Sequence, residues 1–286
     1  KIIIRKDLSE QEIKSMIEDP DNVDFICDYY EKKLPTSRRY QVQFLRLSLS
    51  RRKVLTKKYE TKFGEFFKAQ GNRVNKNIHE WFHNNPKGMK IDPEKMLRFI
   101  FSLSDENDEL ADEVQPLHVA GVTGAVSDIN GLTNATVQSS MANPWVKKAV
   151  ARCGSMLIKT HAMNEVTQEK IKDILGAWIS GDQNISNLTD SMSALFDGYE
   201  GWRARRVART ESRIAWDQGA KINYKDQGVG YVDVVGCESF EANSDCGRVG
   251  VPIDQADTLN FHPNHIGAIV PAEKTGMPSE TPEANA

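Results

Sequence analysis

Apolar residues recur at intervals of three and four along much of this chain, and that spacing limits the fold to a mainly helical one. The clearest case begins at Thr167, which is expected to cap a helix, and ends at Gly181, a residue type that commonly follows the last turn. Between them lies one apolar stripe, made of Ile171, Ile174, Leu175, Trp178 and Ile179.

The first 115 residues carry further helix signals. A long helix is predicted from Ser37 to about Gln70. Asp92 before Pro93 is typical of a helix start, because aspartate caps the first turn and proline fits the first helical position. That helix is expected to run into an acidic stretch at residues 105–109, interpreted as a solvated exit.

Composition changes abruptly between Val119 and Ala142, where Gly, Ala, Ser, Thr and Asn dominate. This stretch is either a junction between regions or a segment of small residues packed closely against a neighbour. Further helices are predicted to begin at Asn143-Pro144 and Ser186, and another to run from about Gly201 to Asp226.

After Gly230 the residues Tyr231–Val235 alternate and are β-branched, which predicts a strand. Polar, proline-containing residues close the chain and predict a disordered tail. The expected architecture is mainly α, with a helical N-terminal region (1–115), a helical core (116–230), a small β-containing, loop-rich segment (231–271) and the tail (272–286).

Composition excludes some classes of function. The chain has 286 residues and a formal charge of −3, which gives no global signal for nucleic-acid binding. No apolar stretch approaches the roughly 18 to 20 residues that a membrane span needs, so no membrane partner is expected. The four cysteines are widely spaced, which favours a reduced, cytosolic protein over a disulfide scaffold.

Short motifs follow one another between Gly121 and Pro271. Their order is Asn143-Pro144-Trp145, the Thr167 helix, Trp202-Arg203-Ala204, Ala208-Arg209-Thr210-Glu211, Ala215, Gly219, Cys246 and His262-Pro263-Asn264. In order and spacing this set resembles the phage head morphogenesis family, also called the Mu protein F-like minor head proteins. The resemblance covers about half of the chain and leaves residues 1–115 outside.

The resemblance implies a minor head protein that acts at the portal vertex of a bacteriophage, in capsid assembly and in DNA packaging or ejection. Its implied partner is the portal protein, with capsid protein, scaffold protein or DNA as further candidates. It implies a virion component assembled in the host bacterial cytoplasm, and not an enzyme. The sequence departs from many relatives after Cys246, where Gly247-Arg248-Val249 stands in place of a C-x-x-C pair.

Two groups of charged residues are candidates for interaction. In the first, comprising Arg203, Arg206, Arg209 and Glu211, the spacing favours ion pairs along or across helices. Phosphate or portal binding by the arginines, and catalysis by Glu211, are the alternatives.

The second group is a basic stripe from Arg38 to Lys62 with a single acid, Glu60. Such a stripe forms a solvated helix face, contacts an acidic protein face or the chain's own acidic residues 105–113, or follows DNA phosphates. Its candidate interaction residues are Arg51, Arg52, Lys53, Lys57 and Lys58.

Two candidate metal sites remain. Cys237, Cys246, His262 and His265 offer the sulfur and nitrogen ligands of a structural zinc site, although the spacing of eight residues between the cysteines is unfamiliar. The alternative is a buried Cys237, a free Cys246 and a His-Pro turn. His79, Glu80 and His83 match the H-E-x-x-H pattern of zinc-dependent hydrolases, but a plain amphipathic helix is favoured.

Overall fold

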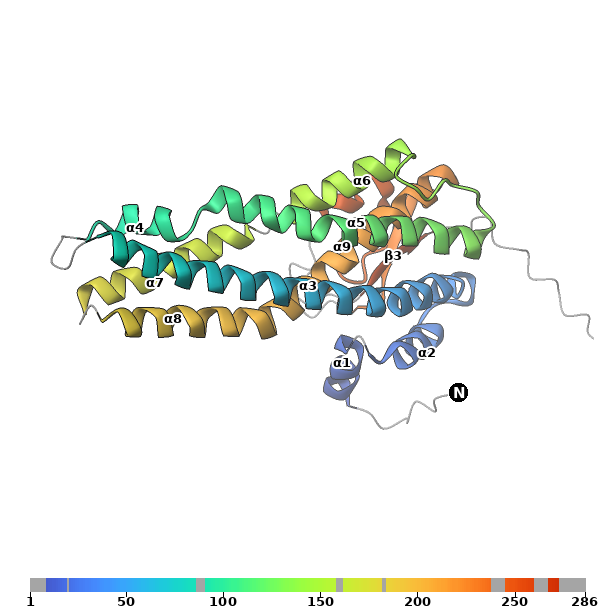
Figure 1. The fold of residues 1–286 in the computed structure, drawn as a ribbon. Coiled ribbons are helices and arrows are strands. Elements are labelled where there is room, and N and C mark those ends of the chain that lie inside the picture. Colours follow the sequence, from blue (N-terminus) through green and yellow to red (C-terminus); the bar gives the residue numbers. More distant parts are fainter. Residues whose placement is uncertain are drawn as a thin grey trace, which may run out of the picture. The chain divides into compact units, whose positions relative to one another are not determined.

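The computed structural model describes residues 9–19, 21–85, 91–157, 162–181, 184–237, 245–259 and 267–272. The fold is mainly α with a small antiparallel sheet, as the sequence predicts (Figure 1). The α-helices are α1 (Glu10–Glu18), α2 (Val23–Lys33), α3 (Gln41–Asn84), α4 (Pro93–Ile100), α5 (Leu103–Thr133), α6 (Pro144–Ser155), α7 (Met163–Ser180), α8 (Ile185–Gly198) and α9 (Ala204–Asp226). The described chain also contains the 3₁₀ helices η1 (Thr36–Arg38) and η4 (Ile253–Thr258) and a π-helical turn, η3 (Tyr199–Arg203).

The chain forms two compact units, each assembled from segments that are far apart in sequence. Unit 1 contains the described residues of Lys1–Leu55, Val119–Val150 and Ser212–Ala286. Unit 2 contains those of Thr56–His118 and Ala151–Glu211. The chain therefore passes from one unit to the other within helices α3, α5, α6 and α9.

Unit 2 is a bundle of helices. The buried face of α3 contributes Tyr59, Phe63, Phe67, Val74 and Ile78, whose intervals of four and seven residues produce one apolar stripe. Helix α4 packs on α7, and α7 packs on α8. At the other end of α8 the chain continues through η3 into α9.

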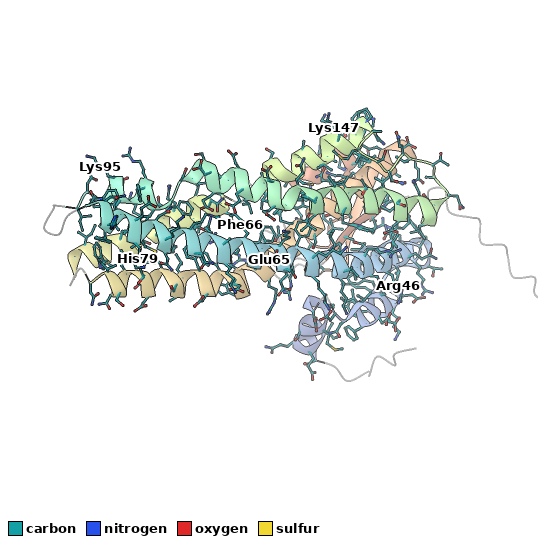
Figure 2. The ribbon with its side chains drawn as sticks, in the orientation of Figure 1. Arg46, Glu65, Phe66, His79, Lys95 and Lys147 are labelled. Carbon is teal, nitrogen blue, oxygen red and sulfur yellow. The ribbon has the colours of Figure 1, made fainter. Side chains whose placement is uncertain are left out.

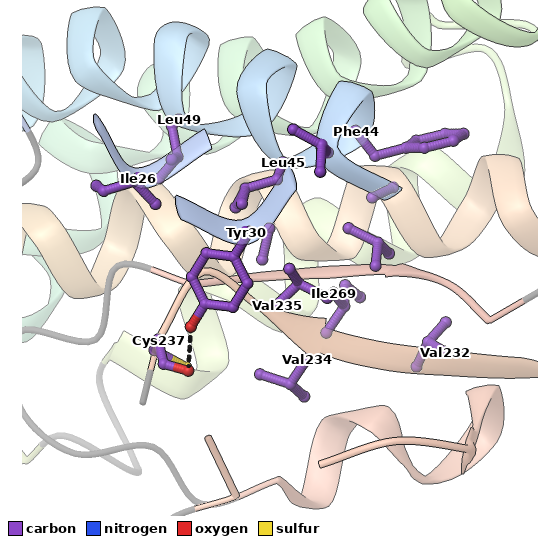
Figure 3. Packing of buried hydrophobic residues seen from close by; sticks show 14 of the residues in the cluster. Ile26, Tyr30, Phe44, Leu45, Leu49, Val232, Val234, Val235, Cys237 and Ile269 are labelled. Atoms are coloured by element: carbon purple, nitrogen blue, oxygen red, sulfur yellow. Dashed lines mark hydrogen bonds between the residues drawn. The ribbon is translucent and has the colours of Figure 1, made fainter. Parts of the chain in front are cut away.

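Unit 1 surrounds a three-stranded sheet with the order β2-β1-β3. Strand β1 (Tyr231–Val235) is central, and β2 (Val251–Pro252) and β3 (Ala268–Pro271) both pair with it in antiparallel fashion. Figure 3 shows Leu45 of α3 above Val235 and Ile269 of the sheet. In the same view the Tyr30 hydroxyl of α2 donates a hydrogen bond of 2.7 Å to the Cys237 carbonyl.

The outer edge of β3 is covered by side chains rather than by another strand. In an antiparallel edge strand, the N–H and C=O groups of every second residue point away from the paired strand. These outward-facing groups need hydrogen-bond partners from elsewhere in the protein. Helices α3 and α9 supply these partners: Arg52 donates to the Gly267 carbonyl at 2.7 Å, Tyr224 to the Ile269 carbonyl at 3.4 Å, and Gln41 to the Pro271 carbonyl at 3.0 Å. Sheet extension by another chain is therefore blocked at this edge.

Helix α5 corrects one expectation and bears on another. It begins at Leu103, so the acidic residues 105–109 form its first turns and are not a solvated exit from α4. Glu106 is buried because Arg73 donates to both of its carboxylate oxygens, at 3.1 and 2.7 Å. The helix then continues to Thr133, and the chain passes from unit 2 to unit 1 inside it, between His118 and Val119, where the composition changes. Residues 119–133 are thus helical, and close packing of a small residue is confirmed for Gly121, where a Cβ atom would lie 2.6 Å from that of Ala215.

Other boundaries also differ from the prediction. Helix α3 extends to Asn84 rather than to about Gln70. Thr167 does not cap α7, because that helix begins at Met163. The Thr167 hydroxyl instead lies buried inside the helix, donates to the Met163 carbonyl at 3.0 Å and accepts from Arg203. A threonine that forms hydrogen bonds inside a helix and a threonine that caps a helix cannot be told apart in the sequence, because either can precede the same apolar stripe.

Candidate interaction surface

Arg203, the first candidate interaction residue, is buried in unit 2. Its guanidinium donates to the Met163 carbonyl at 2.7 Å and to the Thr167 hydroxyl at 3.0 Å. It also lies 4.1 Å from the centre of the Tyr199 ring, a distance typical of cation–π contacts. Burial lowers the pKa of Arg203, and the proximity of Tyr199 opposes this. Arg203 therefore fixes η3 against α7 and does not face a partner.

Glu211 is also buried and lies 3.2 Å from the His118 Nε2 atom of α5. The Glu211 carboxylate faces the interior of unit 2, so it does not belong to the ion pairs that were expected on the helix surface. The ring of Tyr59 packs near His118, with the ring centres 5.8 Å apart. This cluster of polar side chains joins α3, α5 and α9 inside the bundle.

Gly219 continues the same motif into unit 1, where α9 crosses α5. A Cβ atom at Gly219 would lie 2.3 Å from the Val122 carbonyl oxygen and 2.7 Å from the Ala125 Cβ atom. The backbones of α5 and α9 can approach this closely only because the residue has no side chain. From Arg203 to Gly219, the buried motif residues hold helices together.

The exposed residues of the motif lie on the outer face of unit 2. Arg206 is exposed, Arg209 is partly exposed, and Trp202 keeps 58% of its surface open to solvent. On α3, Lys57 is exposed as well. Trp202 was not singled out as an interaction residue by the sequence, because large apolar residues at helical spacing are usually buried.

The basic stripe of α3 is largely paired with acids of its own chain. Arg51 contacts Asp128 at 3.0 Å and Lys53 contacts Asp21 at 2.7 Å, both in unit 1, and Lys62 contacts Glu113 at 2.6 Å in unit 2. Arg52 is buried, and burial lowers its pKa to about 10. Lys57 and Lys58 are exposed and have no ion pair within the described residues. The stripe is thus not one continuous cationic surface.

Unit 1 contains a groove between the first turns of α3 and the last turns of α5, with a volume of about 890 Å³. Arg39, Arg46 and Arg51 line it together with Glu31 and Asp128. Arg46, marked in Figure 2, donates to Asp24 of α2 at 2.5 Å. Acids thus offset most of the positive charge around this groove.

The metal candidates are only partly described. Cys237 and Cys246 are buried in the hydrophobic core of unit 1 and form no disulfide, while His262 and His265 lie outside the described residues. His79, Glu80 and His83 are exposed near the end of α3, and Figure 2 marks His79 there. In the described part of the chain, no group of three or more His, Cys, Asp or Glu side chains is arranged to hold a metal ion.

Comparison with family models, with curated proteins and with solved structures finds no match for this chain. Among the described helices, none is both long enough and apolar enough to cross a membrane.

Proposed function

We propose that this chain is a minor head protein of a bacteriophage, which acts at the portal vertex in capsid assembly and in DNA packaging or ejection. The proposal rests on the ordered motifs between Asn143 and Pro271 that resemble the phage head morphogenesis family. Its proposed partner is the portal protein, and its proposed place is the virion head.

One structural observation supports the proposal: the most specific motif occupies packing positions. Arg203 anchors η3, Glu211 contacts His118, and Gly219 permits the close crossing of α5 and α9. A motif of this kind fixes how the helices pack against one another. A structural component of an assembly requires such a defined helical fold. Arg206, the exposed arginine of the motif, is then available to a partner.

The test is co-expression of the chain with the portal protein of the same phage, followed by purification in moderate salt and native mass spectrometry. The samples are treated with nuclease so that DNA does not bridge the proteins. A stable complex with a few copies per portal ring is expected, and mass spectrometry of purified virions should detect the chain. Absence of a complex with portal, capsid and scaffold proteins, together with absence from virions, would overturn the proposal.

A further inference from the structure

An exposed tryptophan is held in a fixed position on unit 2. Trp202 belongs to the π-helical turn η3, which lies between buried Tyr199 and the anchored Arg203. The backbone of the turn is therefore held in place, and 58% of the Trp202 surface is exposed. Single exposed apolar residues are common on protein surfaces, so the significance of Trp202 depends on the residues around it.

Cationic residues share its face. Arg206 and Arg209 follow Trp202 after four and seven residues, the spacing that places side chains on one side of a helix. Arg206 is exposed and Arg209 is partly exposed. With a rise of about 1.5 Å per residue, the three side chains span roughly 10 Å along the helix.

Helix α3 extends the same face. Arg205 of α9 contacts Glu60 of α3 at 3.1 Å, and Glu200 of η3 contacts Lys68 of α3 at 3.9 Å. The two segments therefore run antiparallel, because the later residue of one segment contacts the earlier residue of the other. One turn beyond Arg205 lies Arg209, and one turn before Glu60 lies Lys57, so these two cations come opposite each other.

The resulting surface is positively charged although the chain as a whole carries −3. Its acids, Glu60 and Glu200, each contact a cation of the same surface. Within the described residues, Lys57 and Arg206 have no ion pair. We call this surface the basic face; it consists of Lys57, Lys68, Trp202, Arg205, Arg206 and Arg209.

We infer that the basic face docks onto an acidic surface of a partner protein, with Trp202 entering an apolar pocket and Lys57, Arg206 and Arg209 meeting carboxylates. This inference rests on the proposed function, in which the partner is the portal ring. Tryptophan and arginine are the residue types that most often dominate binding energy at protein interfaces. A nucleic acid fits less well, because Glu60 and Glu200 lie among the cations and repel phosphates.

The test compares two full-length double variants for binding to the portal protein. The first, Trp202→Ala with Arg206→Glu, alters the basic face. The second, Trp145→Ala with Lys147→Glu, is the matched control, because Trp145 in unit 1 is 65% exposed and Lys147 beside it is exposed too. All four side chains project into solvent, so circular dichroism and urea unfolding should match the wild type.

Substitution in the basic face is expected to weaken portal binding at least tenfold, and the control is expected to bind like the wild type. Equal binding by both variants, or an equal loss in both, would overturn the inference. Loss of binding to a 30-base-pair DNA duplex with retained portal binding would overturn it too, in favour of a nucleic-acid surface. If the wild type itself fails to bind the portal, the inferred partner is wrong, whereas the proposed function falls only if the chain also binds neither capsid nor scaffold protein and is absent from virions.

Discussion

Tyr59 carries a fully buried hydroxyl that has no hydrogen-bond partner among the described residues. Burial raises the pKa of Tyr59 well above its ordinary value, and the nearby Glu211 and Cys153 raise it further. The hydroxyl therefore stays protonated and offers a donor that the bundle does not use. A buried polar group without a partner costs free energy that an apolar group of the same shape does not.

Replacing Tyr59 with Phe is expected to leave the free energy of unfolding unchanged or to raise it by about 1 kcal/mol. The control is Tyr30→Phe, which removes the same atom from a hydroxyl that donates to the Cys237 carbonyl at 2.7 Å. That change is expected to destabilise the protein by about 1 kcal/mol. Urea unfolding of both variants gives the two values, and a destabilised Tyr59→Phe would mean that the hydroxyl has a partner in solution.

At the scale of elements, the outer edge of β3 depends on side chains from α3 and α9. Arg52 illustrates this, because its guanidinium satisfies the Gly267 carbonyl from inside unit 1. Its neighbour Arg51 is 60% exposed at the side chain and contacts Asp128 at the surface. Adjacent arginines on one helix thus have different roles, set by the side of α3 on which each lies.

Arg52→Met is expected to lower the free energy of unfolding by about 2 to 3 kcal/mol, because a buried carbonyl loses a charged donor. Arg51→Met should cost less than about 1 kcal/mol, as expected for an exposed ion pair. Hydrogen exchange adds a local readout: the amides of Tyr231–Val235 and Ala268–Val270 should exchange faster in the Arg52 variant only. Equal exchange in both variants would mean that the edge is held by other contacts.

Helices α5 and α9 cross closely at Gly219. Gly219→Ala is expected to destabilise the protein by about 2 to 3 kcal/mol, because the added Cβ atom forces two helix backbones apart. Gly124→Ala is the control on α5, where a Cβ atom would meet nothing within 4 Å. It should be neutral or stabilise the helix by up to about 1 kcal/mol. Thermal unfolding of the two variants compares them directly, and a neutral Gly219→Ala would contradict the close crossing.

Sequence spacing predicted these elements well, because helix signals are local. Asp92 with Pro93 starts α4, Pro144 starts α6, and Tyr231–Val235 is a strand, all as expected. The partners of these elements were beyond prediction, since they depend on contacts between distant segments. Nothing in the run Arg203–Arg209 distinguishes an arginine anchored on the Met163 carbonyl from one that faces solvent.

The same limit applies to the candidate sites. Lys57 and Arg209 come from separate charged stretches, and only the antiparallel course of α3 and α9 brings them onto one face. Glu106 was interpreted as solvated because its neighbours are acidic, whereas Arg73 holds it inside unit 2. Burial of a charged residue depends on a partner that sequence spacing does not reveal.

At the scale of the whole molecule, each unit draws on segments from both halves of the chain. The core of unit 1 combines apolar residues before position 50 with others after position 219. In unit 2, Gln70 donates to Asn164 at 3.0 Å and Asn75 to Ser193 at 3.1 Å. The predicted boundary after residue 115 lies within α5.

A fragment of residues 1–115 is therefore expected not to fold alone, because it lacks the strands that cover Leu45 and the helices that cover Phe67. It should show no cooperative urea transition and should bind a dye that reports exposed apolar surface. Mixing it with residues 116–286 should restore helical circular dichroism if the two pieces complement each other, as segments of shared cores do. A cooperative transition of the fragment alone would instead make residues 1–115 a domain of their own, since a segment that unfolds cooperatively must contain its own core.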